Sequence, residues 1–329
     1  MDNIMANIKT AVTLFSLGTM YLNGQLDFEG CVREVAKMGA EGYEIVAAQS
    51  IPSYPFVSDE FLHQVETYKD KYGIAPICYG ANMDCGMLKH RDLTEDEMVA
   101  RAITDIMSAN KLGCTVMREQ YLLSPHGLAR LAPYAEAYNV RVGIEIHNPE
   151  SPVTPAMLEY LEVIEKTGSK YLGFIPDFGC FATKPNKPIW DRALRKGAMV
   201  EQLNYCAKLK YDEVSRAEAL KIMESEIEKC PALSDVINSF YGFVQFKKDI
   251  KKELEGLKRI MPYCFEMHGK CHYVDENLHE PAIPYEEIIP TIASTDFDGY
   301  IVTEYEDEGG YNALEQCARH IAMMKKLRG

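Results

Sequence analysis

The stretch Val142-Gly-Ile-Glu-Ile-His147 decides the fold, because it places two ionisable side chains in an apolar run that would otherwise fill the core of a sheet. Side chains in a strand alternate between its two faces, so Glu145 and His147 point the same way. Three later apolar runs also end in an ionisable residue: Tyr171–Asp177, Cys264–His268 and Tyr300–Glu304. Buried charges persist only when they are paired, hydrogen-bonded or bound to a metal. These four runs therefore predict four strands that carry one shared polar site.

The rest of the chain repeats a short β-rich run followed by a longer stretch of helical period, which is typical of βα units around a parallel sheet. Eight such units close most naturally into a (β/α)8 TIM barrel, whose functional groups lie at the C-terminal ends of the strands. The predicted strands are 8–15, 41–47, 74–80, 113–118, 141–147, 171–177, 263–270 and 299–304, and the predicted helices are 28–38, 59–71, 94–112, 127–138, 154–167, 285–294 and 312–327.

One interval is too long for a single βα unit. Asp177 and His268 are 91 residues apart, whereas one unit needs about 30 residues or slightly more. The surplus, about residues 181–258, contains helix-like segments near 189–210, 215–229 and 232–257. We therefore expect one domain, residues 1–329, with a helical insertion between strands six and seven. The insertion could pack on the outer helices, form a subunit interface or cover the site.

The polar strand ends predict a metal site with a proton-transfer group beside it. Three carboxylates and one imidazole, from Glu145, Asp177, His268 and Glu304, form an oxygen-rich set that suits Mn²⁺, with Mg²⁺, Fe²⁺ or Zn²⁺ as alternatives. His147 is the candidate catalytic acid/base, because an imidazole exchanges protons near neutral pH. A fifth ligand or a supporting histidine is the alternative for His147.

Other polar residues on the predicted strands are candidates for substrate contacts. Glu266 and Lys270 share the face of the strand-seven histidine, and an interior ion pair is their alternative. Arg118, at the end of strand four, could contact a substrate oxygen, although a pair with a neighbouring acid is favoured. Glu44 and Tyr79 are candidates for the barrel rim. The remaining histidines are expected to face solvent, with approach to a substrate as the alternative for the loop that carries His272 and His279: His63, His90, His126, His272, His279 and His320.

Composition argues against several other classes of protein. A formal charge of −14 disfavours nucleic acid and anionic membranes as partners, because phosphate groups attract clustered Lys and Arg. There is no apolar run long enough to span a bilayer, and Met1–Ile4 lacks the basic flank of a signal peptide, so the expected location is the cytoplasm. Ten cysteines without a CxxC pair are expected to be reduced.

With these positions in place, the chain resembles the xylose-isomerase-like TIM barrels, which include sugar isomerases, epimerases, inosose dehydratases and endonuclease IV. An endonuclease would need more histidine ligands and a basic groove, and a barrel that only binds ligands would not need His147 beside the metal. In one departure from the family, Cys180 stands where many members have a histidine. The motifs that carry the resemblance are Ile144-Glu-Ile-His147, Pro176-Asp177, Met267-His-Gly-Lys270 and Asp298-Gly-Tyr-Ile-Val-Thr-Glu304-Tyr-Glu306.

The long insertion and the segments Phe178–Phe181 and Glu304–Gly310 are most similar to the alpha subunit of bacterial C-glycoside deglycosidases. This resemblance implies a Mn²⁺-dependent lyase that cleaves 3-oxo-glucosides, with the four strand-end ligands on the metal and His147 as the base. The base would remove the proton next to the ketone, and the aglycone would leave by β-elimination. A small β-rich second subunit is also implied. The same groups would support a divalent-metal-dependent sugar isomerase or epimerase, which is the alternative.

Overall fold

The computed structural model describes residues 6–83, 85–120, 122–307 and 309–329. Its eight strands are all parallel and form one sheet in the order β6-β5-β4-β3-β2-β1-β8-β7. The isolated bridges Phe174–Cys264 and Asp177–His268 join β6 to β7, so the barrel is nearly closed. The predicted TIM barrel is confirmed. The strands are β1 (Asn7–Thr13), β2 (Tyr43–Val46), β3 (Pro76–Gly80), β4 (Val116–Glu119), β5 (Arg141–Ile146), β6 (Leu172–Pro176), β7 (Glu266–Cys271) and β8 (Asp298–Tyr305).

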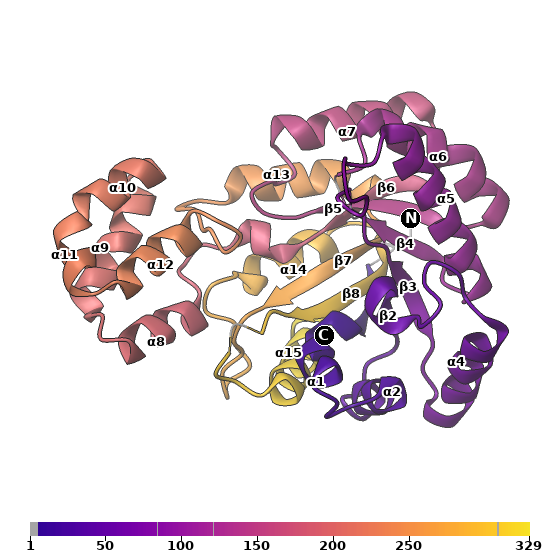
Figure 1. Cartoon of the computed structure of the whole chain (residues 1–329), viewed down its shortest axis with the longest axis horizontal. Helices are drawn as coiled ribbons and strands as arrows, with labels where there is room; N and C mark the ends of the chain where they lie inside the picture. The colour runs from indigo at the N-terminus through magenta and orange to yellow at the C-terminus, as the bar shows by residue number, and fades with distance from the viewer. Residues whose placement is uncertain (1–5, 84, 121, 308) are drawn as a thin grey trace.

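Helices surround the barrel (Figure 1). Several of them begin or end at residues that cap the helix. Thr94 and Glu97 form a capping box at the start of α5, which pairs two backbone N–H groups that the helix leaves free. Gly73 and Gly168 end α4 and α7 with φ of 73° and 62°, a conformation that glycine adopts without strain. The helices that follow strands are α2 (Phe28–Lys37), α4 (Asp59–Tyr72), α5 (Glu95–Lys111), α6 (Pro125–Tyr138), α7 (Pro155–Thr167), α13 (Lys251–Ile260), α14 (Tyr285–Ala293) and α15 (Ala313–Arg328), with short helices α1 (Gly18–Leu22) and α3 (Ala47–Ser50) in loops.

The barrel interior has an apolar layer with charged residues above it. Cys78, Val116, Ile175 and Phe265 form a small buried cluster separate from the main core, which lies between the strands and the outer helices. Residues nearer the C-terminal ends of the strands continue the same inward-facing series with carboxylate, imidazole, guanidinium and ammonium groups. The interior therefore excludes water at its lower level and places charge at the end where TIM barrels carry their sites.

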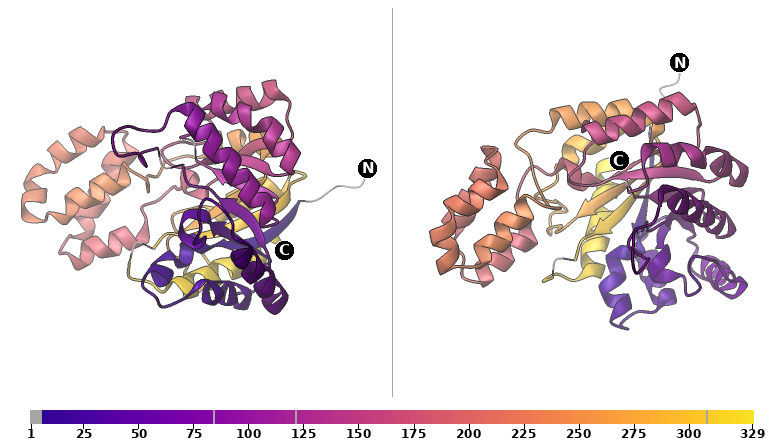
Figure 2. Two further views of the ribbon diagram at one scale, coloured as in Figure 1. Left: turned by 45° about the vertical axis from the view of Figure 1, so that its right-hand side comes forward. Right: turned by 45° about the horizontal axis from the view of Figure 1, so that its top comes forward.

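The connection between β6 and β7 contains a group of helices that lies beside the barrel (Figures 1 and 2). Helix α12 contacts each of the four helices before it, so these helices pack on one another; we call residues 187–240 the helical lobe. The C-terminal ends of β7 and β8 point toward this lobe in Figure 1. The lobe comprises α8 (Lys187–Arg195), α9 (Val200–Tyr211), α10 (Arg216–Ile222), α11 (Glu224–Lys229) and α12 (Ala232–Phe240).

All three helices predicted in this connection are broken in the structure, and the predicted helix 215–229 divides at Met223 into α10 and α11. The predicted helix 189–210 is interrupted at Gly197, which has φ of 95° and separates α8 from α9. The predicted helix 232–257 is interrupted by residues 241–249, which we call the mouth loop, and its second part, α13, lies on the barrel wall beside α14. Phe246 in the mouth loop is buried between Tyr211 and Phe240, with ring centroids 5.0 Å from each. This aromatic anchor competes with helix formation and holds the loop against the lobe.

Two expectations drawn from composition can be compared with the structure. The described residues contain no disulfide, and nine of the ten cysteines are buried. In the described part of the chain, no helix combines the length and the apolar character that crossing a bilayer requires. The residues Met1–Ile4, which underlie the expectation about a signal peptide, lie outside the described residues.

Candidate metal centre and active site

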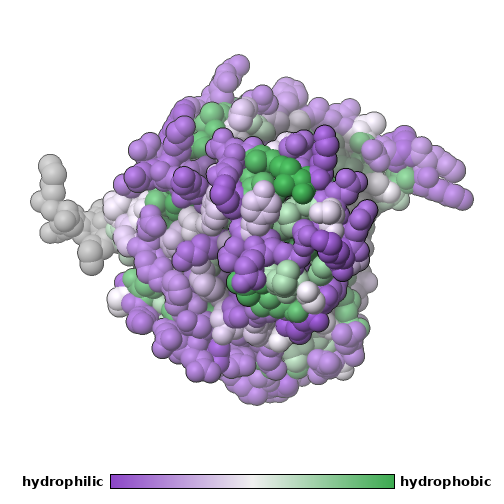
Figure 3. Space-filling view, turned by 90° about the vertical axis from the view of Figure 1, so that its left-hand side faces the viewer, coloured by the Kyte–Doolittle hydropathy of each residue, from purple (hydrophilic) through white to green (hydrophobic). Residues whose placement is uncertain are grey.

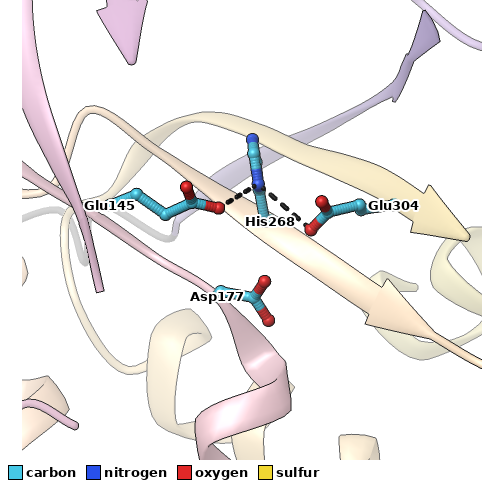
Figure 4. Close-up of side chains that lie close together, drawn as sticks. All are labelled: Glu145, Asp177, His268 and Glu304. Atoms are coloured by element: carbon cyan, nitrogen blue, oxygen red, sulfur yellow. Dashed lines mark ion pairs between the residues drawn. The ribbon is translucent and has the colours of Figure 1, made fainter. Parts of the chain in front are cut away.

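The four predicted metal ligands converge at the C-terminal end of the barrel (Figure 4). Glu145 lies on β5, Asp177 follows β6, His268 lies on β7 and Glu304 lies on β8. One ligand atom from each side chain lies within 4.8 Å of the others, and all four residues are buried. Strand pairing explains the common level, because Asp177 bridges to His268 and the β7 residue Lys270 is level with Glu304. The chain thus brings these ligands together from four strands.

The donor atoms of this cluster fit a divalent cation. His268 Nδ1 lies 3.0 Å from Glu145 Oε1 and 3.2 Å from Glu304 Oε2. Asp177 Oδ2, His268 Nδ1 and Glu304 Oε2 are buried and make no hydrogen bond within the described residues. Buried polar atoms normally have a partner; the two carboxylate oxygens lie 3.0 Å from Lys270 Nζ, and a metal cation would supply a partner for His268 Nδ1. The set is compatible with Mn²⁺, Mg²⁺, Fe²⁺ and Zn²⁺.

Lys270 supplies positive charge within the cluster. Its Nζ lies 3.0 Å from Asp177 Oδ2, 3.0 Å from Glu304 Oε2 and 2.8 Å from Glu306 Oε2. Burial alone would lower the pKa of Lys270, but these carboxylates outweigh burial and raise it well above its usual value. Burial raises the pKa of Asp177 to about 6 even though Lys270 opposes the shift. The ammonium group therefore balances negative charge that water cannot solvate here.

Arg118 makes the ion pair that the sequence favoured for it. Its Nη1 lies 3.5 Å from Glu145 Oε2, and both side chains are buried. Burial alone would raise the pKa of Glu145, but Arg118 and His268 outweigh it and hold this pKa at about 2. The guanidinium thus keeps a candidate ligand ionised. Arg118 and Glu266 are not among the residues that line the cavity described below.

Glu44 contacts a predicted metal ligand directly, whereas the sequence placed it at the barrel rim. Its Oε2 accepts a hydrogen bond from His268 Nε2 at 3.0 Å, and its Oε1 accepts one from Thr13 Oγ1 at 2.7 Å. This contact leaves His268 Nδ1 facing the ligands, which is the usual arrangement of a metal-bound histidine. Burial raises the pKa of the neighbouring Glu266 to about 8. Glu44, Glu266 and His268 also lie within 4.8 Å of one another, but a neutral imidazole has only one free nitrogen lone pair to give to a metal.

His147 lines a cavity of about 190 Å³ that reaches the ligand cluster at Asp177. Its Nδ1 is 2.9 Å from the Asn148 carbonyl oxygen, which can only accept, so Nδ1 carries the hydrogen. In the neutral ring Nε2 is then the free lone pair, and it lies 3.8 Å from Asp177 Oδ2. The side chain is 25% exposed. His147 is therefore placed to take a proton from a molecule in the cavity. The cavity is lined by barrel residues that include His147, Asp177, Lys270, His272 and Glu306, and by Phe243, Val244 and Gln245 of the mouth loop.

Tyr79 is one candidate that the structure does not bring to the site. It is fully buried on the outer side of β3, where its hydroxyl donates to Asp105 Oδ1 of α5 at 2.8 Å. Cys78 belongs to the interior cluster, so its neighbour Tyr79 must point away from the barrel axis. The assignment of Tyr79 to the rim was therefore wrong, because Cys78 and not Tyr79 is the residue of this strand that faces the barrel interior.

Two histidines expected at the surface are buried. His272 lines the cavity, and burial lowers its pKa to about 3. His320 lies on the inner face of α15, where Nε2 donates to the Tyr285 hydroxyl at 2.7 Å and Nδ1 accepts from Thr303 Oγ1 at 2.8 Å. Hydrogen bonds to distant residues replace water for His320, which local sequence could not reveal. His63, His90 and His126 are exposed as predicted, and the partly exposed His279 pairs with Glu286.

Comparisons with known proteins agree with this architecture. Residues 32–327 match the family described as xylose isomerase-like TIM barrel. The 3'-dehydrocarminate deglycosidase alpha subunit of a Microbacterium species is 30% identical over 309 residues, which cover 91% of this chain and 88% of that protein. The C-glycoside deglycosidase alpha subunit of Arthrobacter globiformis is 29% identical over 98% of this chain and 92% of its own length.

A solved structure shows the same fold at lower identity. D-psicose 3-epimerase, determined in the presence of D-fructose, superposes with a TM-score of 0.58 and 13% identity over 98% of this chain and 100% of that one. The family match and the eight-stranded parallel barrel together show that this chain belongs to the xylose isomerase-like TIM barrel family.

Proposed function

We propose that the protein is a Mn²⁺-dependent lyase that cleaves 3-oxo-glucosides by proton abstraction next to the ketone and β-elimination of the aglycone. The observation that carries this proposal is the lone pair of His147 Nε2, which faces a cavity beside the buried ligand cluster. Similarity to two deglycosidase alpha subunits over most of the chain supports the same reaction.

The metal would be held by Glu145, Asp177, His268 and Glu304. When bound, a divalent cation supplies a Lewis acid that stabilises negative charge developing on a ketone oxygen. Lys270 lines the cavity and is the best placed of the predicted substrate-binding residues to contact a sugar oxygen. Its ammonium group also keeps the carboxylates of the cluster ionised around the substrate.

His147 would perform the proton transfers. Nε2 takes the C2 hydrogen as a proton, and the electron pair of that bond forms the C1–C2 double bond as the bond from C1 to the aglycone breaks. The aglycone leaves with the electron pair of its bond and receives the proton back from the imidazolium, so the sugar remains as an α,β-unsaturated ketone. Asp177 Oδ2, 3.8 Å from Nε2, stabilises the imidazolium while it holds the proton.

The alternative, a divalent-metal-dependent sugar isomerase or epimerase, is favoured by one observation. Glu145 and Glu304 lie on either side of His268 Nδ1 (Figure 4). Two carboxylates that flank a substrate could remove a proton from one face and return it to the other. In that case no group would leave C1.

Product analysis separates the two reactions. Metal-loaded protein is mixed with a 3-oxo-glucoside of a phenol and, separately, with free ketoses, and products are identified by NMR and mass spectrometry. The lyase releases free phenol and an unsaturated keto sugar, whereas epimerised or isomerised sugar without release would refute it. His147→Gln should lower turnover by roughly 10²–10⁴-fold while bound metal stays at the wild-type level. The matched control is His126→Gln, which alters an exposed histidine of α6.

We further propose that the chain acts in the cytoplasm with a small β-rich second subunit, as a hetero-oligomer. The relatives' designation as alpha subunits supports a partner. On the face that presents the helical lobe, hydrophobic patches lie among hydrophilic side chains (Figure 3). Residues 181–258 would then be an insertion in a single domain, 1–329, that holds this partner or covers the site. Co-expression with a small β-rich protein encoded by a neighbouring gene should yield one complex on gel filtration. Separate elution of the two proteins would contradict the proposed second subunit.

A further inference from the structure

The cavity beside His147 can enclose a sugar unit but not a complete aryl glucoside. Its volume is about 190 Å³, below the range of roughly 300–1,000 Å³ for pockets that bury drug-sized ligands. The buried residues Asp177, Lys270 and His272, which line the cavity, are polar and suit the sugar oxygens. An aglycone attached to an enclosed sugar must therefore extend past the mouth, where it meets the mouth loop.

The aromatic ring of Phe243 is exposed at this mouth. Among the described residues that line the cavity, it is the only Phe, Tyr or Trp. It is 71% exposed, and its ring centroid lies 5.8 Å from that of His147 with an interplanar angle of 63°. If His147 removes the C2 proton, the neighbouring C1 and its aglycone lie within reach of the Phe243 ring.

The backbone around Phe243 is held in place on both sides. Asn148 Nδ2 donates to the Phe243 carbonyl oxygen at 3.1 Å and to the Gly179 carbonyl oxygen at 2.9 Å, which ties the mouth loop to the residue after His147. Phe246 anchors the loop in the lobe, and Lys247 N donates to the Ala182 carbonyl oxygen at 3.0 Å. The exposed ring is thus presented on a fixed support, which reduces the ordering that a ligand must impose.

We infer that Phe243 is a stacking platform for an aromatic aglycone and selects aromatic over non-aromatic leaving groups. This inference rests on the proposed function and assigns a residue that determines substrate specificity at the same site. Aromatic rings in offset or edge-to-face contact attract each other beyond the effect of the area they bury. A small non-aromatic leaving group would lack this ring–ring attraction and would make a smaller contact with Phe243.

The test compares two 3-oxo-glucosides, one with a fused-ring polyphenol and one with trifluoroethanol, which is a small non-aromatic leaving group. The variants are Phe243→Ala and Phe243→Tyr. The matched control is Tyr205→Ala, which removes an exposed aromatic ring of the helical lobe that does not line the cavity. Binding of the free polyphenol to metal-free protein, measured by calorimetry, gives a readout that does not depend on turnover.

For Phe243→Ala, the KM for the polyphenol glucoside should rise by roughly fivefold to tenfold, with the Kd of the free polyphenol rising in parallel. The kcat, and both constants for the trifluoroethyl glucoside, should change by less than about twofold, and Phe243→Tyr should behave as wild type. Equal losses on both glucosides, or no loss on either, would overturn the platform. A wild-type protein that cleaves neither glucoside but binds the polyphenol through Phe243 would reject the lyase and keep the platform.

Discussion

Removing the carboxylate of Glu44 should weaken divalent-metal binding although Glu44 is not one of the four predicted ligands. The Glu44 side chain accepts hydrogen bonds from His268 Nε2 at 3.0 Å and from Thr13 Oγ1 at 2.7 Å, and all three residues are buried. Glu44 therefore fixes the orientation of the imidazole and its hydrogen, and it increases the electron density that Nδ1 can donate to a cation.

The size of the effect follows from what each substitution leaves behind. Loss of such a supporting carboxylate typically weakens metal binding about 10-fold to 100-fold, or roughly 1.4–2.7 kcal/mol. Glu44→Gln keeps an acceptor oxygen for Nε2 and a donor for Thr13 but removes the charge, so it belongs at the lower end. Glu44→Ala leaves a buried N–H without its partner and belongs at the upper end.

The assay is a titration of metal-free protein with Mn²⁺ in competition with a chelating dye, with circular dichroism to verify the fold. Glu41→Gln is the matched control, because Glu41 lies three positions earlier and pairs with Arg328, away from the ligand cluster. Folded Glu44 variants that bind Mn²⁺ within about twofold of wild type would refute the positioning role.

Three further predictions concern protons and charge. Metal affinity should fall as pH falls, by about tenfold per pH unit for each displaced proton. The pKa of His268 is held high because Glu44 and Glu304 outweigh burial, so metal must displace a proton from this imidazole. Below the pKa of Asp177, which is about 6, metal must displace a second proton. The plot of metal affinity against pH, measured by dye competition, should therefore become steeper below about pH 6. Burial raises the pKa of Glu119 to about 8, which is above its unfolded value, so this group should cost wild type on the order of 1–3 kcal/mol of stability from pH 5 to pH 8. Denaturant unfolding of Glu119→Gln should show a loss that is smaller by this amount, and equal losses in the two proteins would contradict the assignment. Lys270→Met should lower the melting temperature of metal-free protein, because buried carboxylates lose their counter-charge, and enlarge the rise caused by metal; an unchanged melting temperature would contradict this role.

The main ligands could be predicted because their signal is local. An ionisable residue at the end of an apolar strand is unusual, and the C-terminal ends of parallel strands meet at one end of a barrel. Four such endings therefore led to Glu145, Asp177, His268 and Glu304, which the structure brings within 4.8 Å of one another. The strand alternation in the same runs also placed His147 on the side of the site.

The remaining parts depend on contacts between distant segments. Glu44 and His268 are 224 positions apart in the chain, and nothing near Glu44 predicts that its strand reaches the level of the ligands. His320 looks like a polar helix residue until Tyr285 and Thr303 are seen to satisfy both of its nitrogens. The break at the mouth loop likewise depends on how Phe246 packs against the lobe.

The most direct test of the metal centre is an anomalous diffraction map from crystals of the protein loaded with Mn²⁺. One peak should lie roughly 2.0–2.6 Å from oxygens of Glu145, Asp177 and Glu304 and from Nδ1 of His268. A peak elsewhere, or saturating Mn²⁺ with no peak among these four side chains, would contradict the account.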